Sequence, residues 1–154
     1  MKYRSLLPAL LRWLPVLSWM FLIFWLSHQP GDESRRMSEW VVQLVRWLGM
    51  DETSIAAGRL NFLIRKAAHF TEYCILSLLL SQVLARSLAQ PRLALTATLL
   101  TALYACTDEW HQTFVPGRVG TWTDALIDTA GALLGAGIWH TGQRFFRHNS
   151  KKIS

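Results

Sequence analysis

Residues 9–26 read ALLRWLPVLSWMFLIFWL, an apolar run in which Arg12 is the only charged side chain. A helix of about 20 mostly apolar residues is long enough to cross the hydrocarbon core of a bilayer. The four runs of this kind predict an all-α fold, an integral membrane bundle of four transmembrane helices that forms a single domain over residues 1–154. The three later runs lie at about residues 67–85, 93–110 and 121–139.

The composition favours a membrane protein over a soluble one. Hydrophobic residues make up 51% of the chain and charged residues only 17%, whereas soluble domains carry about 25% charged residues. Tryptophan lies at the ends of the runs, as in the aromatic belts of membrane proteins, at Trp13, Trp25, Trp110, Trp122 and Trp139. A soluble bundle of four buried helices is the alternative, because the last three runs are polar at one end.

The basic residues are distributed unevenly between the two sides that four spans define. The termini and the connection at 86–92 hold nine of the 16 basic residues and none of the ten acidic ones. Lys and Arg are retained on the cytoplasmic side, so we predict a bacterial inner-membrane protein with both termini, including the basic tail 140–154, in the cytoplasm. The net charge of +6 then reflects the topology of the chain in the membrane. We expect the partner of the protein to be the lipid bilayer, and no nucleic-acid partner is required to explain the charge. The nine residues are Lys2, Arg4, Arg12, Arg86, Arg92, Arg144, Arg147, Lys151 and Lys152.

The predicted outer loop between the first two spans, at about residues 28–65, contains a shorter helix. In residues 37–49, MSEWVVQLVRWLG, apolar side chains recur at 37, 40, 41, 44, 47 and 48, which is helical spacing. Gly49 is a typical C-terminal stop. This amphipathic helix is too short to span; it either lies in the membrane interface or packs on the bundle, and the sequence leaves both open.

Polar residues gather at the outer ends of the last three predicted spans. Because neighbouring spans run in opposite directions, these residues come to similar depths. Ionisable groups at such a depth favour a functional cavity, here one that opens to the outside, whereas the alternative is an ion-pair network that pins the helices together. The residues are Arg65, His69 and Glu72 on one helical stripe, Asp108, Glu109, His111 and Gln112 on the next span, Arg118 after a Pro-Gly turn, and Asp124.

Five members of this cluster are candidates for acid–base catalysis: His69, Glu72, Asp108, Glu109 and His111. The pairs 69/72 and 108/111 have a spacing that can chelate, but neither forms the HExxH arrangement. We therefore predict no metal site, and no motif identifies a cofactor.

Arg118 is the residue we expect to recognise a ligand. A guanidinium binds phosphate or carboxylate through two parallel hydrogen bonds, whereas an ammonium acts as a point charge. The alternative is a structural clamp, in which the carboxylates of Asp108, Glu109 and Asp124 neutralise Arg118.

Two features of the last span lie deeper in the predicted bundle. Gly131 and Gly135 are four residues apart, a spacing that lets two helix backbones approach closely. Asp128 lies one turn after Asp124, and its role stays open.

Three sequence blocks add a family signature: RKAAHFTEY at 65–73, DEWHQTFVPGR at 108–118, and Asp124 before a glycine-containing helix. In this order they resemble the VanZ-like family of bacterial membrane proteins, and WLSHQ at 25–29 fits the end of its first span. The resemblance covers residues 20–140. Asp128 stands where the family often has Asn, so a shared amide role is not expected there.

The family is named for a protein that lowers susceptibility to the glycopeptide antibiotic teicoplanin. The resemblance implies a cell-envelope membrane protein and identifies the matching blocks as its working parts, without supplying a reaction. The ligand-binding residues expected from the polar cluster and the resemblance together are Arg65, His69, Glu72, Tyr73, Asp108, Glu109, His111, Gln112, Arg118 and Asp124.

Three classes of function follow. The favoured one is a protein that binds or shields a lipid-linked cell-wall precursor, or another anionic lipid, and thereby alters teicoplanin susceptibility. The alternative is an intramembrane hydrolase or transferase that acts on a lipid-linked phosphate or ester with the His, carboxylate and Arg groups. A proton-coupled transporter is least favoured, because four short spans without a pair of broken helices do not provide alternating access.

The charge asymmetry makes the topology testable. A Gly49→Cys variant, in a chain whose Cys74 and Cys106 are replaced by Ala, should react with a membrane-impermeant thiol reagent in intact cells. If labelling requires cell lysis, the orientation is the opposite of the predicted one, and the polar cluster lies on the cytoplasmic side.

Overall fold

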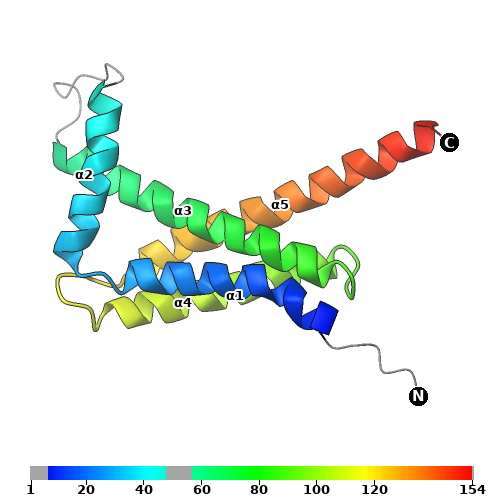
Figure 1. The fold of residues 1–154 in the computed structure, drawn as a ribbon, viewed down its shortest axis with the longest axis horizontal. Helices are drawn as coiled ribbons and strands as arrows, with labels where there is room; N and C mark the ends of the chain where they lie inside the picture. The colour runs from blue at the N-terminus through cyan, green and yellow to red at the C-terminus, as the bar shows by residue number, and fades with distance from the viewer. Residues whose placement is uncertain (1–6, 48–56, 154) are drawn as a thin grey trace.

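The computed structural model describes residues 7–47 and 57–153 and confirms the all-α prediction (Figure 1). Within these ranges there are five helices and no strand. The helices are α1 (Leu7–Ser27), α2 (Gly31–Trp47), α3 (Ala57–Leu84), α4 (Arg92–Gln112) and α5 (Trp122–Ile153).

Four of the helices form an elongated bundle, and the fifth stands across one end of it. In Figure 1, α1, α3, α4 and α5 run lengthwise, while α2 is turned away from their common direction. The beginning of α1 and the finish of α5 lie at the opposite end from α2. The polar residues predicted to gather therefore share one end of the bundle, where α1 and α4 finish and α3 and α5 begin.

Two of the four predicted spans are identified as membrane-spanning candidates by length and composition. These are Leu10–Ser27 in α1 and Arg59–Leu84 in α3. Helices α4 and α5 are more polar, since α4 includes four threonines as well as Asp108 and Glu109, and α5 includes Asp124 and Asp128. The two apolar helices support a membrane protein, while α4 and α5 are not identified as spans in this way.

The helix ends differ from the prediction in three places. Helix α3 begins at Ala57 rather than 67, and α5 runs to Ile153 through the predicted basic tail. Neither extension contains a proline, the residue that would end a helix there. The amphipathic helix predicted from 37 begins at Gly31 and ends at Trp47, and Gly49 lies outside the described residues.

The bundle exposes a broad apolar surface. Large side chains on three helices are more than half exposed, although a water-soluble monomer rarely leaves so large an apolar area uncovered. The set comprises Leu10, Leu14, Leu17 and Phe21 on α1, Leu95, Leu99 and Leu103 on α4, and Leu126 and Leu133 on α5.

Helices α3 and α5 approach each other closely at two glycines, as predicted. A methyl group added at Gly131 would lie 2.2 Å from the backbone oxygen of Phe70, and one at Gly135 would lie 2.2 Å from the backbone oxygen of Cys74. No side chain fits at such a distance. The two backbones are therefore in direct contact along this face.

A matched pair of glycine substitutions tests this contact. Gly131→Ala should lower the free energy of unfolding in detergent by about 1–3 kcal/mol, because the methyl group forces the helices apart. Gly137→Ala, one to two turns further along the same helix, meets nothing within 4 Å and should leave stability unchanged or raise it slightly, since alanine is the better helix former. Equal effects on the thermal unfolding midpoint would contradict the close contact.

Candidate functional site

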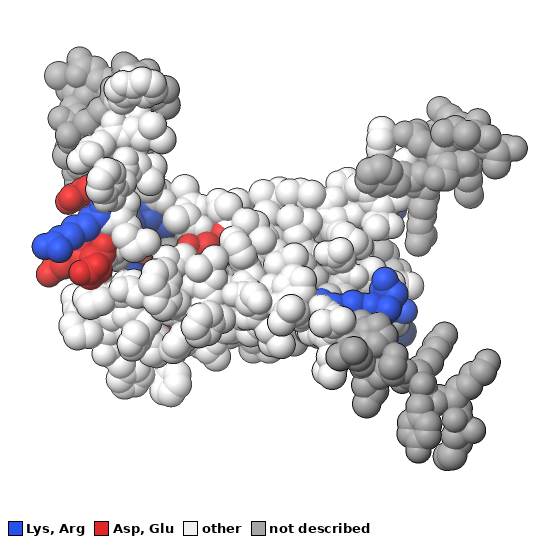
Figure 2. All heavy atoms as spheres, viewed as in Figure 1, with Lys and Arg blue, Asp and Glu red and all other residues white. Residues whose placement is uncertain are grey.

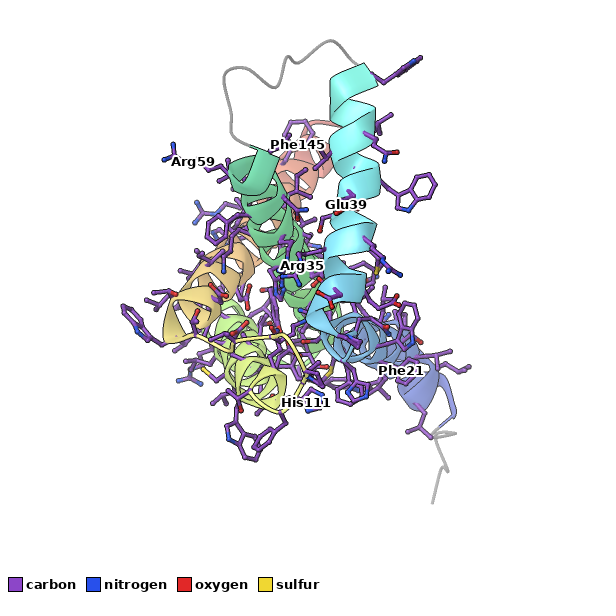
Figure 3. All side chains as sticks on the ribbon, turned by 90° about the vertical axis from the view of Figure 1, so that its left-hand side faces the viewer. Phe21, Arg35, Glu39, Arg59, His111 and Phe145 are labelled. Carbon is purple, nitrogen blue, oxygen red and sulfur yellow. The ribbon has the colours of Figure 1, made fainter. Side chains whose placement is uncertain are left out.

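The site lies at the end of the bundle that carries α2. Figure 2 shows acidic and basic side chains gathered at this end, while most of the visible flank of the bundle is uncharged. Figure 3 looks onto the same end, with the beginnings of α3 and α5 and the finish of α4 around it. The polar side chains come from the first half of α3, the end of α4, the loop between α4 and α5, and the beginning of α5.

Arg118 joins this loop to the end of α1. Its Nε donates a hydrogen bond to the backbone oxygen of Gln29 at 3.0 Å, and its Nη2 donates to that of Leu26 at 2.8 Å. Its Nη1 also lies 3.4 Å from Oε1 of Gln112. Nearby, the backbone N–H of Gly31 donates to the backbone oxygen of Pro116 at 3.0 Å. The α1–α2 junction and the α4–α5 loop are thus held together as one unit.

Arg118 makes these contacts without a carboxylate partner among the described residues. Burial, and then the like charge of Arg65, lower the pKa of its guanidinium below the ordinary value. Arg65 also has no ion pair within the described parts of the chain. Two guanidinium groups are therefore close enough to repel, and neither is neutralised by direct contact.

Asp108 and Glu109 are buried at the end of α4, where they accept hydrogen bonds. Oδ2 of Asp108 accepts from Ser27 Oγ at 2.9 Å and from Nε2 of Gln112 at 3.1 Å. Oε2 of Glu109 accepts the backbone N–H of Thr121 at 2.8 Å. These contacts connect the end of α4 to α1 and to the start of α5.

His69 and Asp128 face each other between α3 and α5. His69 Nδ1 lies 3.8 Å from Oδ1 of Asp128, whose side chain is completely buried. One turn towards the end of the bundle, Lys66 forms an ion pair with Asp124. Lys66 and Asp124 thus form a direct ion pair nearer the end of the bundle, while His69 and Asp128 form a longer contact deeper inside it.

Two cavities adjoin at this end, and they share the same three basic side chains. One has a volume of about 450 Å³ and reaches Lys66 and Asp124; the other is about 170 Å³ and reaches Glu72 and the α2 side chains Ser34, Met37, Ser38 and Val41. Arg65, His69 and Arg118 line both. The wall shared by the two cavities therefore carries two guanidinium groups and an imidazole, while Glu72 and Asp124 each line one cavity.

Most of the predicted site residues converge here. Six of them line a cavity, and Asp108 and Glu109 are buried beside it. Tyr73 is fully buried in the core with Leu76 and Ala105. The six are Arg65, His69, Glu72, Gln112, Arg118 and Asp124.

His111 lies elsewhere, contrary to the expectation that it shares the cavity with His69. Its Nε2 is 3.1 Å from Nδ1 of His28, and its ring packs against Phe24 on the α1 side of α4, as the label in Figure 3 indicates. Residues two apart on a helix point about 200° away from each other. Glu109 and His111 therefore cannot face one cavity together.

The sequence reasoning also missed residues that complete the site. Lys66 is the partner of Asp124, and its place beside Arg65 in the RKAAHFTEY block was the available signal. At the end of α1, Ser27 donates a hydrogen bond to Asp108, and the backbone oxygens of Leu26 and Gln29 accept hydrogen bonds from Arg118. The partners in each bond are more than 80 positions apart in the sequence, so local spacing does not reveal them.

A comparison of the sequence with models of known protein families finds a match that covers most of the chain. The family model described as VanZ/LLP1 matches residues 12–146, which include every cavity-lining residue. None of the curated proteins and none of the solved structures matches the chain.

The contacts of Arg118 predict a role in stability. Arg118→Lys and Arg118→Ala should each lower the free energy of unfolding by about 1.5–3 kcal/mol, because an ammonium cannot reach both backbone oxygens and hydrogen bonds to charged groups are worth about that much. Arg65→Gln, which removes a charge but no hydrogen bond, should leave the thermal midpoint in detergent unchanged. If Arg118→Lys is as stable as wild type, the hydrogen bonds of Arg118 to the backbone do not stabilise the fold. The remaining role for Arg118 would then be ligand recognition.

Proposed function

Because the chain belongs to the VanZ/LLP1 family, we propose that it is a four-span protein of the bacterial inner membrane that binds the anionic headgroup of a lipid-linked envelope component. Both termini lie in the cytoplasm in this proposal, and the cavities open to the outer side. Through that binding the protein shields the lipid and alters susceptibility to teicoplanin.

The distribution of charge along the helices supports four spans. Each of the four long helices contains a run of residues without charge, and in α4 and α5 this run is flanked by charged groups on both sides. The exposed leucines 95, 99 and 103 of α4 and Leu133 of α5 lie along these segments. Trp25, Trp110 and Trp122, each at least half exposed, lie at the polar end, as expected for an interfacial belt. The charge-free segments are 13–27, 73–85, 93–107 and 129–139.

The surface of α2 supports an interfacial position for that helix. Trp40 and Trp47 are 75% and 82% exposed, and Leu44 lies between them on the same exposed stripe, while Ser38 and Val42 are buried. An amphipathic helix with such a face lies in the headgroup region. In Figure 1 this helix runs across the end of the bundle, which is the direction of the membrane plane if the bundle spans.

The observation that carries the binding proposal is the basic wall shared by the two cavities. Arg65 and Arg118 line both cavities, lack a direct carboxylate partner within the described residues and repel each other. A phosphate or carboxylate between them would relieve that repulsion and accept paired hydrogen bonds from guanidinium groups. The smaller cavity continues under α2, beside Met37 and Val41, where the first part of a lipid chain would find apolar contacts.

One observation favours hydrolysis as the second candidate. His69, Glu109 and Asp128 come together next to the basic wall, so a general base and groups that stabilise developing negative charge would be neighbours. In this alternative, the same cavity binds a lipid-linked phosphate or ester and water attacks it.

Lipid binding by the purified protein tests both candidates. In native mass spectrometry the protein should retain a polyprenyl phosphate and release the uncharged polyprenol of the same chain length, because the guanidinium groups recognise the phosphate. Arg65→Gln should weaken retention by about tenfold, the loss expected when one charged hydrogen bond of about 1.4 kcal/mol is removed. Arg36→Gln, which removes an exposed arginine of α2 that lines neither cavity, is the matched control.

The outcome separates the candidates. Equal retention of phosphate and alcohol, or equal retention by Arg65→Gln and wild type, would reject the binding site. A second incubation contains polyprenyl diphosphate. Its hydrolysis by water to polyprenyl monophosphate and inorganic phosphate would establish the hydrolase, whereas retention without a product supports the binding protein.

A further inference from the structure

Three metal-ligand side chains from three different helices converge at one point in the bundle. His69 on α3, Glu109 on α4 and Asp128 on α5 each offer one donor atom, and these atoms lie within 4.8 Å of one another. The convergence does not follow from sequence spacing, because 40 and 19 positions separate consecutive members. It is produced by the packing of α5 against α3 and α4.

Among the described residues, Asp128 has no hydrogen-bond partner. Its side chain is 0% exposed, and both carboxylate oxygens, as well as Nδ1 of His69, lack a donor or acceptor within the described residues. Buried polar groups in native proteins are almost always hydrogen-bonded, and an isolated buried carboxylate is costly. Because the three side chains converge and the polar atoms of Asp128 and His69 lack hydrogen-bond partners, we propose that His69, Glu109 and Asp128 bind a divalent cation.

The donor set indicates which cation fits. One imidazole and two carboxylates suit Zn²⁺ or Mn²⁺. Bonds of about 2.0–2.2 Å to a common ion bring donor atoms to roughly 3.5 Å from each other, so small side-chain rotations would close the present spacing. Three protein ligands leave at least one coordination position open for water or for an oxygen of a bound phosphate, which is the arrangement of reactive metal sites.

Glu109 is already oriented for this role. Its Oε2 accepts the backbone N–H of Thr121, and its Oε1 lies 3.3 Å from Nε2 of Gln112. Such outer contacts hold a ligating carboxylate in place. The inference concerns the cation alone, stands without the lipid-binding proposal, and differs from the sequence-based prediction that the chain has no metal site.

Metal titration of the full chain tests the inference. Protein purified in detergent and stripped with a chelator should take up about one Mn²⁺ per chain when manganese chloride alone is added, measured by the loss of the free-ion EPR signal. The bound ion should show nitrogen modulation from His69 in electron spin-echo spectra. Asp128→Asn should weaken uptake at least tenfold, and His69→Gln should remove the nitrogen modulation. Competition by Zn²⁺ then distinguishes the preferred cation.

Two controls separate a metal site from a structural ion pair. Asp124→Asn removes a carboxylate of the same helix that is paired with Lys66 and should leave Mn²⁺ uptake unchanged. The metal-free thermal midpoint of Asp128→Asn should equal or exceed that of wild type, because the buried carboxylate has no partner to lose. Absence of stoichiometric uptake of Mn²⁺ and Zn²⁺ by wild type would overturn the inference, and so would undiminished uptake by both Asp128→Asn and Glu109→Gln.

Discussion

The direct contact between the backbones of α3 and α5 sets the geometry of the site. Gly131 and Gly135 bring α5 against the backbone oxygens of Phe70 and Cys74, so the helices meet without intervening side chains. His69 lies next to Phe70 in the chain, and Asp128 lies one turn before Gly131. The same approach that packs the centre of the bundle therefore brings these two side chains together.

A second set of contacts fixes the end of the bundle. Arg118 holds the end of α1, Gly31 is hydrogen-bonded to Pro116, and Ser27 is hydrogen-bonded to Asp108. A methyl group added at Gly31 would meet the backbone oxygen of Gly117 at 2.0 Å, so these segments also touch without side chains between them. Helix α2 starts from this junction, which positions its first turns beside the smaller cavity.

Much of this architecture could be predicted from the sequence because it follows from local patterns. Apolar runs identified the four long helices, the period of residues 37–48 identified α2, and the spacing of Gly131 and Gly135 identified the close contact. The expectation that Arg65, His69, Glu72 and Asp124 share one end of the bundle came from the opposite directions of neighbouring spans, although α3 begins earlier than predicted.

Rotation about a helix axis was harder to predict than depth along it. His111 was placed at the right level but on the wrong face, because three buried neighbours, Asp108, Glu109 and Gln112, already occupy the inward face of α4. The partners of Arg118 are backbone oxygens, which carry no sequence signal. The alignment of His69, Glu109 and Asp128 requires three helices to be packed in register, and no single segment contains that information.

The separation of opposite charges at this end favours a binding site over a structural network. Lys66 and Asp124 form a direct ion pair, so the fold can bring a cation and a carboxylate into contact where both need neutralising. Asp128 is nevertheless left without a hydrogen-bond donor, and Arg65 without an ion pair, in the described part of the chain, while Arg118 is held by backbone and amide oxygens rather than by a carboxylate. Burying a carboxylate without a partner is costly, and a purely structural network would pair it. A ligand that presents an anion to the guanidinium groups, and a cation held by the carboxylates, would satisfy both sets at once, and the two proposed ligands are complementary for that reason.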